Sequence, residues 1–104
     1  MKNMIVRYRV KADRAEENAR LVQAVFASLE SERPEGFRYA SFRLDDGVSF
    51  VHIVSQDGEG KGGPLQNLPA FKAFVAEIHD RCDVQPETTV LHEVASYRFF
   101  ESTA

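Results

Sequence analysis

Three side chains in the middle of the chain have the types and spacing that chemistry on a phenol would need. His52 is the leading candidate, because a neutral imidazole could take a proton from a phenol or a hydroquinone. Tyr39 and Arg43 could orient a phenolate or a carboxylate, since arginine presents a fixed fork of hydrogen-bond donors. Two of them also have a structural interpretation: His52 as a core or interface histidine satisfied by a neighbour such as Ser41, and Arg43 as half of a cross-dimer ion pair. The residues alone leave both interpretations open.

The other two histidines are weaker candidates. His92 lies between Val90 and Val94 in an expected strand, and the argument made for His52 makes it a second candidate for ligand binding. His79 lies on an expected helix, where we expect it to face solvent. The candidate site therefore has His52 as its catalytic group, with the substrate bound by Tyr39, Arg43 and His92.

Two arginines have more than one interpretation, and two tyrosines are expected to be structural. Arg7 and Arg9 alternate with apolar residues in the first expected strand, so they could bind a ligand or form cross-dimer ion pairs. Tyr8 and Tyr97 are expected to be packing residues, each with a hydroxyl tethered by a hydrogen bond.

The chain lacks the clusters of residues that metals and nucleotides require. Its three histidines and one cysteine are isolated from one another, unlike the ligands of zinc sites. Residues 57–64 hold four of the six glycines, but without the Gly-Lys-Ser/Thr ending of a phosphate-binding loop we expect a lid or a spacer. Cys82 would complete the apolar stripe of a helix, which predicts a buried, inert thiol. We therefore expect no metal, flavin or haem.

The first half of the chain predicts a strand and a helix. Residues 4–10 are rich in β-branched and aromatic side chains on alternating faces, which is typical of a strand. Asp13 and Glu16 have the spacing of a capping box, so a helix should begin there and end at Pro34 and Gly36. Its expected apolar stripe is Ala15, Ala19, Val22, Phe26 and Leu29, widened by Val25.

The second half predicts a hairpin, a helix and a last strand. Residues 37–44 and 48–56 form two strands joined by Asp45-Asp46-Gly47, a strong hairpin signal. Pro69 suits the first turn of a second helix, and residues 88–100 favour a long final strand. The stripe expected for the second helix is Leu68, Phe71, Val75, Ile78 and Cys82, with Phe74 beside it.

The turn of the hairpin decides which side chains share a face. A two-residue turn at Asp46-Gly47 places Ser41 opposite His52, and Arg43 opposite Phe50. The face with His52 would then line a cavity, and the face expected under the helices is Ala40, Phe42, Leu44, Val51 and Ile53. A three-residue loop would instead place His52 under the helices. We prefer the two-residue turn, because it separates polar from apolar side chains better.

The order strand, helix, two strands, helix, strand predicts an α+β fold of the ferredoxin-like type. Both helices should cover one face of a four-stranded antiparallel sheet. The opposite face still carries large side chains, and a second copy of the chain is the economical way to cover it. We therefore expect a homodimer with a barrel-like cavity at or near its interface.

Composition excludes several classes of protein. With 104 residues, the chain has room for one domain across residues 1–104. A net charge of −3 without a basic cluster argues against binding nucleic acid. The apolar runs are far too short to span a membrane, and the start of the chain has no signal-peptide core. A single cysteine cannot form an internal disulfide, which favours the cytoplasm.

The whole chain resembles the antibiotic biosynthesis monooxygenase-like proteins, whose members are dimeric α+β barrels. The resemblance covers the element order, the length, the stretch Phe-Arg-Leu-Asp-Asp-Gly-Val-Ser-Phe-Val-His at 42–52, and Pro-Ala-Phe-Lys-Ala-Phe at 69–74. The second stretch is similar to the family's Pro-His-Phe-x-x-Phe opening of its last helix, with Ala70 in place of the histidine. The chain also has no tryptophan, which the haem-degrading members use beside the porphyrin. These departures touch the inferred activity more than the inferred fold.

Two functions follow from the resemblance and the candidate residues. The first is the cofactor-independent oxygenation of a small aromatic or quinol, as some members of the family perform. The second is a non-catalytic homodimer that binds a small apolar ligand. RNA binding is disfavoured, because the aromatic and basic motif of RNA-recognition domains is missing.

Overall fold

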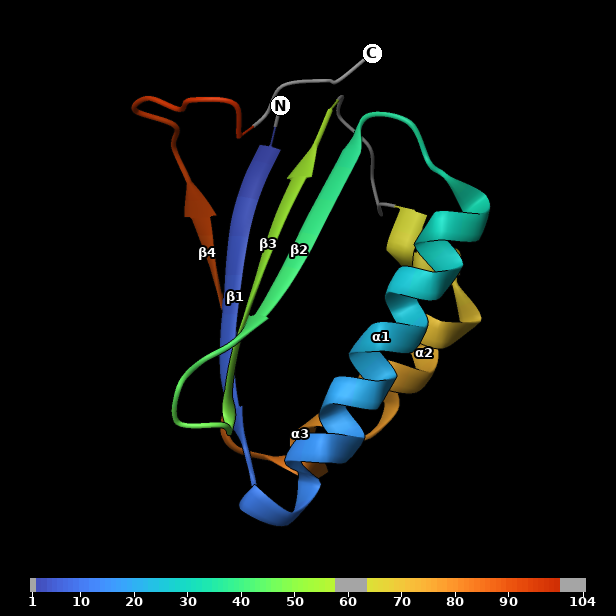
Figure 1. Ribbon diagram of the computed structural model, residues 1–104, viewed down its shortest axis with the longest axis vertical. Coiled ribbons are helices and arrows are strands. Elements are labelled where there is room, and N and C mark those ends of the chain that lie inside the picture. The colour runs from blue at the N-terminus through green and yellow to red at the C-terminus, as the bar shows by residue number, and fades with distance from the viewer. Residues whose placement is uncertain (1, 58–63, 100–104) are drawn as a thin grey trace.

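The computed structural model describes residues 2–57 and 64–99. Four antiparallel strands form one sheet in the order β2-β3-β1-β4, and all the helices lie on one side of it (Figure 1). This is the ferredoxin-like α+β arrangement that the sequence predicts. The elements in chain order are β1 (Lys2–Val10), a 3₁₀ helix (Ala12–Arg14), α1 (Ala15–Glu32), β2 (Phe37–Arg43), β3 (Ser49–Gln56), a 3₁₀ helix (Pro64–Asn67), α2 (Pro69–Ala76), α3 (Ile78–Arg81) and β4 (Cys82–Leu91).

The first helix begins differently from the expectation. A short 3₁₀ helix precedes α1, and neither of these helices has a side-chain cap, so the predicted capping box at Asp13 does not form. Arg14 lies at the junction and contacts the Glu17 carboxylate of the first turn, with 2.6 Å between Nε and Oε1. The helix ends with Arg33 in the left-handed region at φ 48°, where its N–H donates to the Leu29 carbonyl. The expected end before Pro34 is confirmed.

The second helix is shorter than predicted. It breaks at Glu77, α3 follows for one turn, and Cys82 begins β4 opposite Val10 instead of completing a helix stripe. Phe74 faces the core at 4% exposure, whereas Val75, expected in the stripe, is 39% exposed. The helical segment ends at this point because Cys82 pairs with Val10 at the end of β1, and that pairing requires extended backbone. Cys82 is nevertheless buried, as predicted.

The last strand also differs from the prediction. It runs over Cys82–Leu91 rather than over residues 88–100. Pro86 lies inside it, where the pairing with β1 shifts register between Arg7 and Arg9. A proline is tolerated on an edge strand at such an irregularity, because it has no N–H to donate to the ladder.

The register of the hairpin is the predicted one, although its turn is not. Ser41 pairs with His52, and Arg43 with Phe50. The loop spans four residues, 45–48, and is closed by bonds from the Leu44 N–H to the Ser49 carbonyl and from the Gly47 N–H to the Leu44 carbonyl. Gly47 has φ 78°, a conformation that glycine adopts without strain. A four-residue loop keeps the same pairing as a two-residue one, so the face pattern survives the error.

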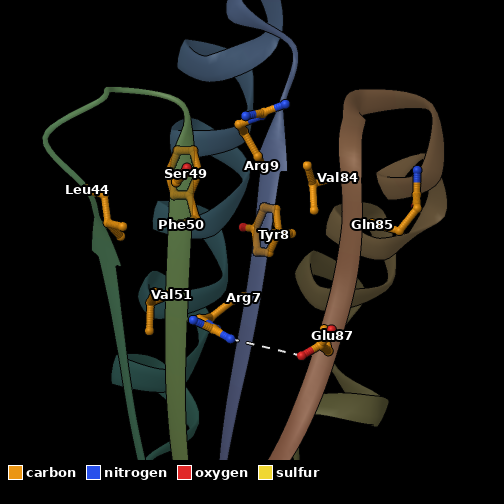
Figure 2. Close-up of a pocket in the computed structure, with 10 residues that line it drawn as sticks. All are labelled: Arg7, Tyr8, Arg9, Leu44, Ser49, Phe50, Val51, Val84, Gln85 and Glu87. Carbon is orange, nitrogen blue, oxygen red and sulfur yellow. Dashed lines mark ion pairs between the residues drawn. The ribbon is translucent and has the colours of Figure 1, made fainter.

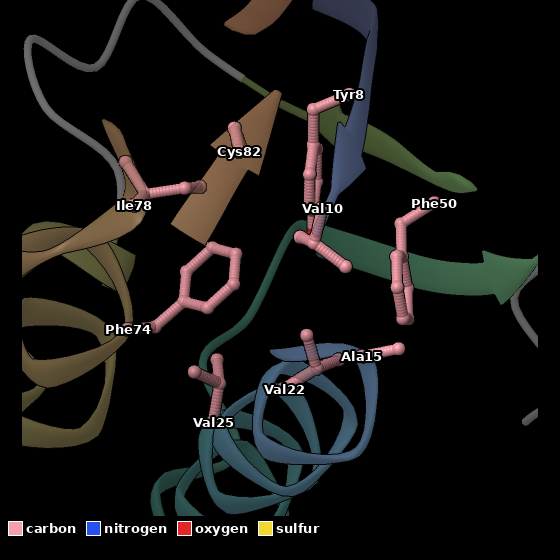
Figure 3. Packing of buried hydrophobic residues seen from close by; sticks show 9 residues of the cluster. All are labelled: Tyr8, Val10, Ala15, Val22, Val25, Phe50, Phe74, Ile78 and Cys82. Carbon is pink, nitrogen blue, oxygen red and sulfur yellow. The ribbon is translucent and has the colours of Figure 1, made fainter. Parts of the chain in front are cut away.

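The two sheet faces are the reverse of the expectation. The face that carries Tyr39, Phe50 and His52 packs under the helices, whereas Phe42 on the opposite face is 48% exposed. The core between sheet and helices gathers side chains from every layer (Figure 3): Tyr8, Val10, Ala15, Val22, Val25, Phe50, Phe74, Ile78 and Cys82. Separation of polar from apolar strand residues was the wrong criterion, because polar tips on the covered face find partners there: His52 bonds Tyr8 and Tyr39, and Tyr8 also bonds Asn18 of α1. None of the helices among the described residues is long and apolar enough to cross a membrane.

Candidate functional site

A largely apolar cavity of about 400 Å³ lies between the sheet and α2. We call it the inner cavity. Strands β1, β2, β3 and β4 form one wall, and α2 and α3 form the other. Its lining residues are Met4, Val6, Tyr8, Tyr39, His52, Val54, Leu65, Phe71, Phe74, Val75, Ile78, His79, Pro86 and Thr88. Apolar walls with a few polar groups at one place are the usual composition of a site for a small organic ligand.

His52 is the centre of the polar part of this cavity. Its Nε2 lies 2.8 Å from the Tyr8 hydroxyl, and its Nδ1 lies 2.6 Å from the Tyr39 hydroxyl. Ser41, the neighbour expected to satisfy it, is more distant, with 3.4 Å between Oγ and Nε2. The ring is 3% exposed and lies against Phe74, at 5.6 Å between centroids. Both ring nitrogens of His52 are therefore occupied by tyrosine hydroxyls.

Two residues from the helical layer continue this network behind Tyr8. Asn18 on α1 places its Nδ2 2.9 Å from the Tyr8 hydroxyl. Arg81 on α3 donates from Nε to the Asn18 Oδ1 at 3.1 Å and from Nη2 to the Phe74 carbonyl at 2.6 Å. Asn18 is 0% exposed and Arg81 is 1% exposed. An arginine this deeply buried needs its donors satisfied, and the Phe74 ring at 5.3 Å adds a cation–π contact.

Burial keeps the polar centre uncharged. It lowers the pKa of His52 to about 4, so the imidazole is neutral at neutral pH. It also raises the pKa of Tyr39 and the pKa of Tyr8 well above the usual range, so both hydroxyls keep their protons. The inner cavity thus ends in a neutral tyrosine–histidine pair that can donate and accept hydrogen bonds.

Arg43 lies near Tyr39 but not in the inner cavity. Tyr39 and Arg43 line a second hollow of about 590 Å³, beside α1. Arg43 pairs with Glu16 at 2.8 Å, donates to the Gly47 carbonyl at 2.8 Å and lies 5.7 Å from the centroid of the Phe50 ring. Tyr39 therefore lines the inner cavity together with His52 and the second hollow together with Arg43. His52 and Arg43 do not line the same cavity. The ion pair of Arg43 is made within the chain.

His92 is the predicted site residue that the structure sets apart. It is exposed, follows the end of β4, and lines a hollow formed with Asn3, residues 91–97 and Phe99. The expectation that it shares a cavity with His52 is wrong, because the strand that was to carry it ends at Leu91. His79 is exposed, as predicted, yet it lines the inner cavity and bonds Gln85 at 2.6 Å.

The opposite face of the sheet carries a smaller hollow of about 290 Å³ (Figure 2). Arg7 points across it to Glu87 at 4.0 Å, and Arg9 pairs with Asp83 at 2.8 Å. Both arginines therefore form ion pairs within the chain, whereas the structural interpretation had expected cross-dimer ion pairs. Tyr8, on the inner side of the same strand, is the packing residue with a tethered hydroxyl that the sequence predicts.

Some expectations concern other parts of the chain. Tyr97 is 81% exposed, so its predicted packing role is wrong, although the Arg98 guanidinium lies 5.2 Å from its ring. Of the glycine-rich lid or spacer expected at residues 57–64, residues 58–63 lie outside the described residues, so this expectation stays a prediction. In the part of the chain that the structure describes, no three or more His, Cys, Asp or Glu side chains gather into a group that could hold a metal ion.

Sequence reasoning missed Asn18 and Arg81. A signal for Asn18 was present, because it stands three residues after Ala15 and four before Val22, within the apolar stripe of α1. A polar residue in such a stripe is buried and needs partners. Arg81 had no comparable signal, since its burial depends on the turn from α3 into β4.

Comparisons with known proteins support the fold. No family model and no curated protein matches the chain. Solved structures do match: a Nitrosomonas europaea protein named for antibiotic biosynthesis monooxygenases has TM-score 0.76 and 16% identity, with 91% of this chain and 100% of that chain covered. SnoaB, a cofactor-independent oxygenase from Streptomyces nogalater, has TM-score 0.68 and 16% identity, with 93% and 96% covered. A Pseudomonas aeruginosa protein has TM-score 0.73 and 19% identity, with 90% and 94% covered.

These matches cover nearly the whole length of this chain and of each matched protein, but the sequence identity is low. They therefore show a shared fold. They agree with the resemblance in the sequence, and in this chain the matched region contains the four-stranded antiparallel sheet with its helices on one face. The chain has the fold of the structures named antibiotic biosynthesis monooxygenases.

Proposed function

We propose that this protein is a cofactor-independent monooxygenase-like enzyme that oxidises a small phenol or quinol inside the inner cavity. The observation that carries the proposal is the neutral Tyr39–His52 pair at the polar end of an otherwise apolar cavity of about 400 Å³. Such a cavity suits a flat aromatic ring with one oxygen at the polar end. The name of one matched structure, a cofactor-independent oxygenase, supports the same chemistry.

The contacts assign different roles to the two residues. Direct proton abstraction by His52 needs a free ring nitrogen, and hydroxyls occupy both. A base whose pKa is about 4 would also take a proton from a phenol unfavourably. We therefore assign the contact with the ligand oxygen to Tyr39, and the orientation of Tyr39 to His52.

The proposed reaction balances without a cofactor. A phenol with hydrogen on its para carbon, or a quinol, reacts in its ionised form with O₂. A carbon–oxygen bond forms at the ring, the O–O bond breaks, and the ring is oxidised to a quinone. One oxygen atom stays in the quinone, and the other leaves as water with the two hydrogens lost from the substrate. The site contributes a hydrogen bond from Tyr39 to the ionised oxygen of the substrate, and turnover should rise with pH through the pKa of the substrate.

We also propose that the protein works as a homodimer, joined through the sheet face that the helices leave uncovered. That face carries large apolar side chains that are half exposed, with Phe42 at 48%, Leu44 at 44% and Val84 at 47%. Covering such side chains removes apolar area from water, which drives association. Light scattering should give twice the chain mass of 11.8 kDa, and Phe42→Glu should return the mass to that of one chain. A wild-type mass of one chain would refute the dimer. The cytoplasmic location stays a prediction.

The oxidation is tested with purified protein and substituted naphthols or hydroquinones as substrates. Oxygen consumption should match quinone formation, ¹⁸O₂ should label the product with one atom, and an anaerobic control should show neither. Tyr39→Phe should slow turnover, whereas Tyr97→Phe is a matched control whose ring is 81% exposed and should retain it. If these substrates bind without any oxygen-dependent product, the protein is a binder of small aromatic ligands and the oxygenase proposal fails.

A further inference from the structure

One continuous row of hydrogen bonds runs from Arg81 through Asn18, Tyr8 and His52 to Tyr39. The successive distances are 3.1, 2.9, 2.8 and 2.6 Å. The first four members are between 0% and 3% exposed, so water does not compete for their donors and acceptors. The direction of each bond can therefore be worked out from the group at the buried end.

Arg81 sets the direction of the first two bonds. A guanidinium carries donors and no acceptor, so the Asn18 atom that faces it must be the amide oxygen. The amide nitrogen of Asn18 then faces Tyr8 and donates to its hydroxyl oxygen. This fixes an orientation of the asparagine that its shape alone would leave open.

The bond from Asn18 to Tyr8 also determines which nitrogen of His52 carries the hydrogen. Its hydroxyl hydrogen needs an acceptor, and among the described residues its other partner is the His52 Nε2. Tyr8 therefore donates to Nε2, and the neutral imidazole carries its own hydrogen on Nδ1, from which it donates to Tyr39. The reverse arrangement would leave the Tyr8 hydrogen without an acceptor in a side chain that is 3% exposed. Ser41, 3.4 Å from Nε2, can donate weakly to that nitrogen in the favoured arrangement.

The row ends at the inner cavity with an unused donor. Tyr39 accepts from His52, and its own hydroxyl hydrogen has no acceptor within the described ranges 2–57 and 64–99. We propose that the inner cavity selects ligands that present an acceptor oxygen to Tyr39, such as a phenolate or a quinone carbonyl. Arg81 and Asn18 impose this preference as positioning residues. The ligand site is that of the proposed function, but the hydrogen-bond direction does not depend on turnover.

The tautomer of His52 is the direct readout. In the ¹⁵N-histidine-labelled full chain at neutral pH, two-bond ¹H–¹⁵N correlation spectra should show His52 protonated on Nδ1, and His52→Gln identifies its signals. Asn18→Asp replaces a donor by a carboxylate that only accepts, at the same size. Tyr8 should then donate to that carboxylate, His52 should donate to Tyr8 from Nε2, and the tautomer should reverse.

Two outcomes of these spectra would overturn the inference. A wild-type protein with the hydrogen on Nε2 contradicts the direction of the row, and an unchanged tautomer in Asn18→Asp contradicts the role of Asn18. If that variant does not fold, Tyr8→Phe removes the donor to Nε2 and should abolish the preference for Nδ1; a retained preference overturns the inference as well. Ser41→Ala is the matched control and should leave the tautomer as it is.

The ligand preference is tested by calorimetry with 1,4-naphthoquinone, which has only acceptors, and with naphthalene, which has none. The wild-type protein should bind the quinone about tenfold tighter, the worth of one buried hydrogen bond. Tyr39→Phe should remove the difference, and Tyr97→Phe should keep it. Equal affinities in the wild-type protein, or no binding of either probe, would overturn the proposed preference. An enzyme that binds the quinone as expected but shows no turnover would refute only the oxygenase proposal.

Discussion

Strand β1 makes two kinds of polar contact on its two faces. On the helix side, Tyr8 joins His52 and Asn18 in a network in which every member is at most 3% exposed. On the open side, Arg7 and Arg9 pair with carboxylates of β4 through side chains that are 65% and 49% exposed. The same strand thus carries a buried, directional network and a solvated set of ion pairs one residue apart.

The difference shows where a polar residue determines structure and where it does not. In the buried network no water can replace a missing partner, so each donor must meet an acceptor and one residue orients the next. In the exposed pairs water and salt offset most of the attraction. Substitutions on the two faces should therefore differ strongly in their effect, and that contrast can be measured.

The largest expected effect comes from breaking the buried end of the network. Arg81→Met removes the donors that satisfy the Asn18 oxygen and the Phe74 carbonyl, and should lower the free energy of unfolding by about 3 kcal/mol. Arg7→Met on the open face is the matched control. Urea unfolding measures both variants. A loss as large for Arg7 as for Arg81 would contradict the comparison.

The next effect is a loss of stability in acid that belongs to His52. Its pKa falls from about 6.5 to about 4 on folding, so between these values the unfolded chain binds a proton that the folded chain does not. The free energy of unfolding should therefore fall as pH drops through this window, by about 3 kcal/mol from this group. His52→Gln should flatten this part of the profile. An unchanged profile in His52→Gln would show that the histidine is not held neutral by burial.

A smaller effect is expected at the cavity end of the network. Tyr39→Phe leaves the His52 Nδ1 without its partner and should lower the free energy of unfolding by about 1 kcal/mol. Tyr97→Phe, on an exposed ring, should cost nothing measurable. The comparison is sharpened if a saturating quinone ligand stabilises the wild-type protein against heat more than it stabilises Tyr39→Phe. Equal stabilisation of the two would place the ligand away from Tyr39.

Local patterns predicted the fold well. The element order, the antiparallel sheet and the opposition of Ser41 and His52 follow from alternation, helix periodicity and the hairpin signal. The pairing survived an error in the turn, because two-residue and four-residue loops leave the same residues on the same face. Periodicity within a strand is local, so it is readable from one sequence.

The position of the candidate site depended on contacts between distant parts of the chain, and there the predictions were weaker. Both faces of the hairpin carry apolar side chains, so alternation alone could not decide which face the helices cover. Polarity pointed to the wrong face, since His52 is satisfied by Tyr8 and Tyr39 on neighbouring strands. Asn18 and Arg81 come from elsewhere in the sequence to complete the network behind Tyr8. Similarly, the spacing of Cys82 fits the apolar stripe of a helix, but its pairing with β1, which is distant in the sequence, places it in a strand. Tyr39 and His52 were identified because their residue types stood out, and His92 was misplaced because its strand ends early.

The central claim is that the inner cavity receives an aromatic ligand with its oxygen at Tyr39. A crystal structure of the protein with 1,4-naphthoquinone bound tests this most directly. The account predicts the ring between the sheet and α2, against Phe71 and Phe74, with a quinone oxygen within hydrogen-bonding distance of the Tyr39 hydroxyl. A quinone bound in the hollow beside Arg43, or on the open face of the sheet, with the inner cavity empty of ligand, would contradict it.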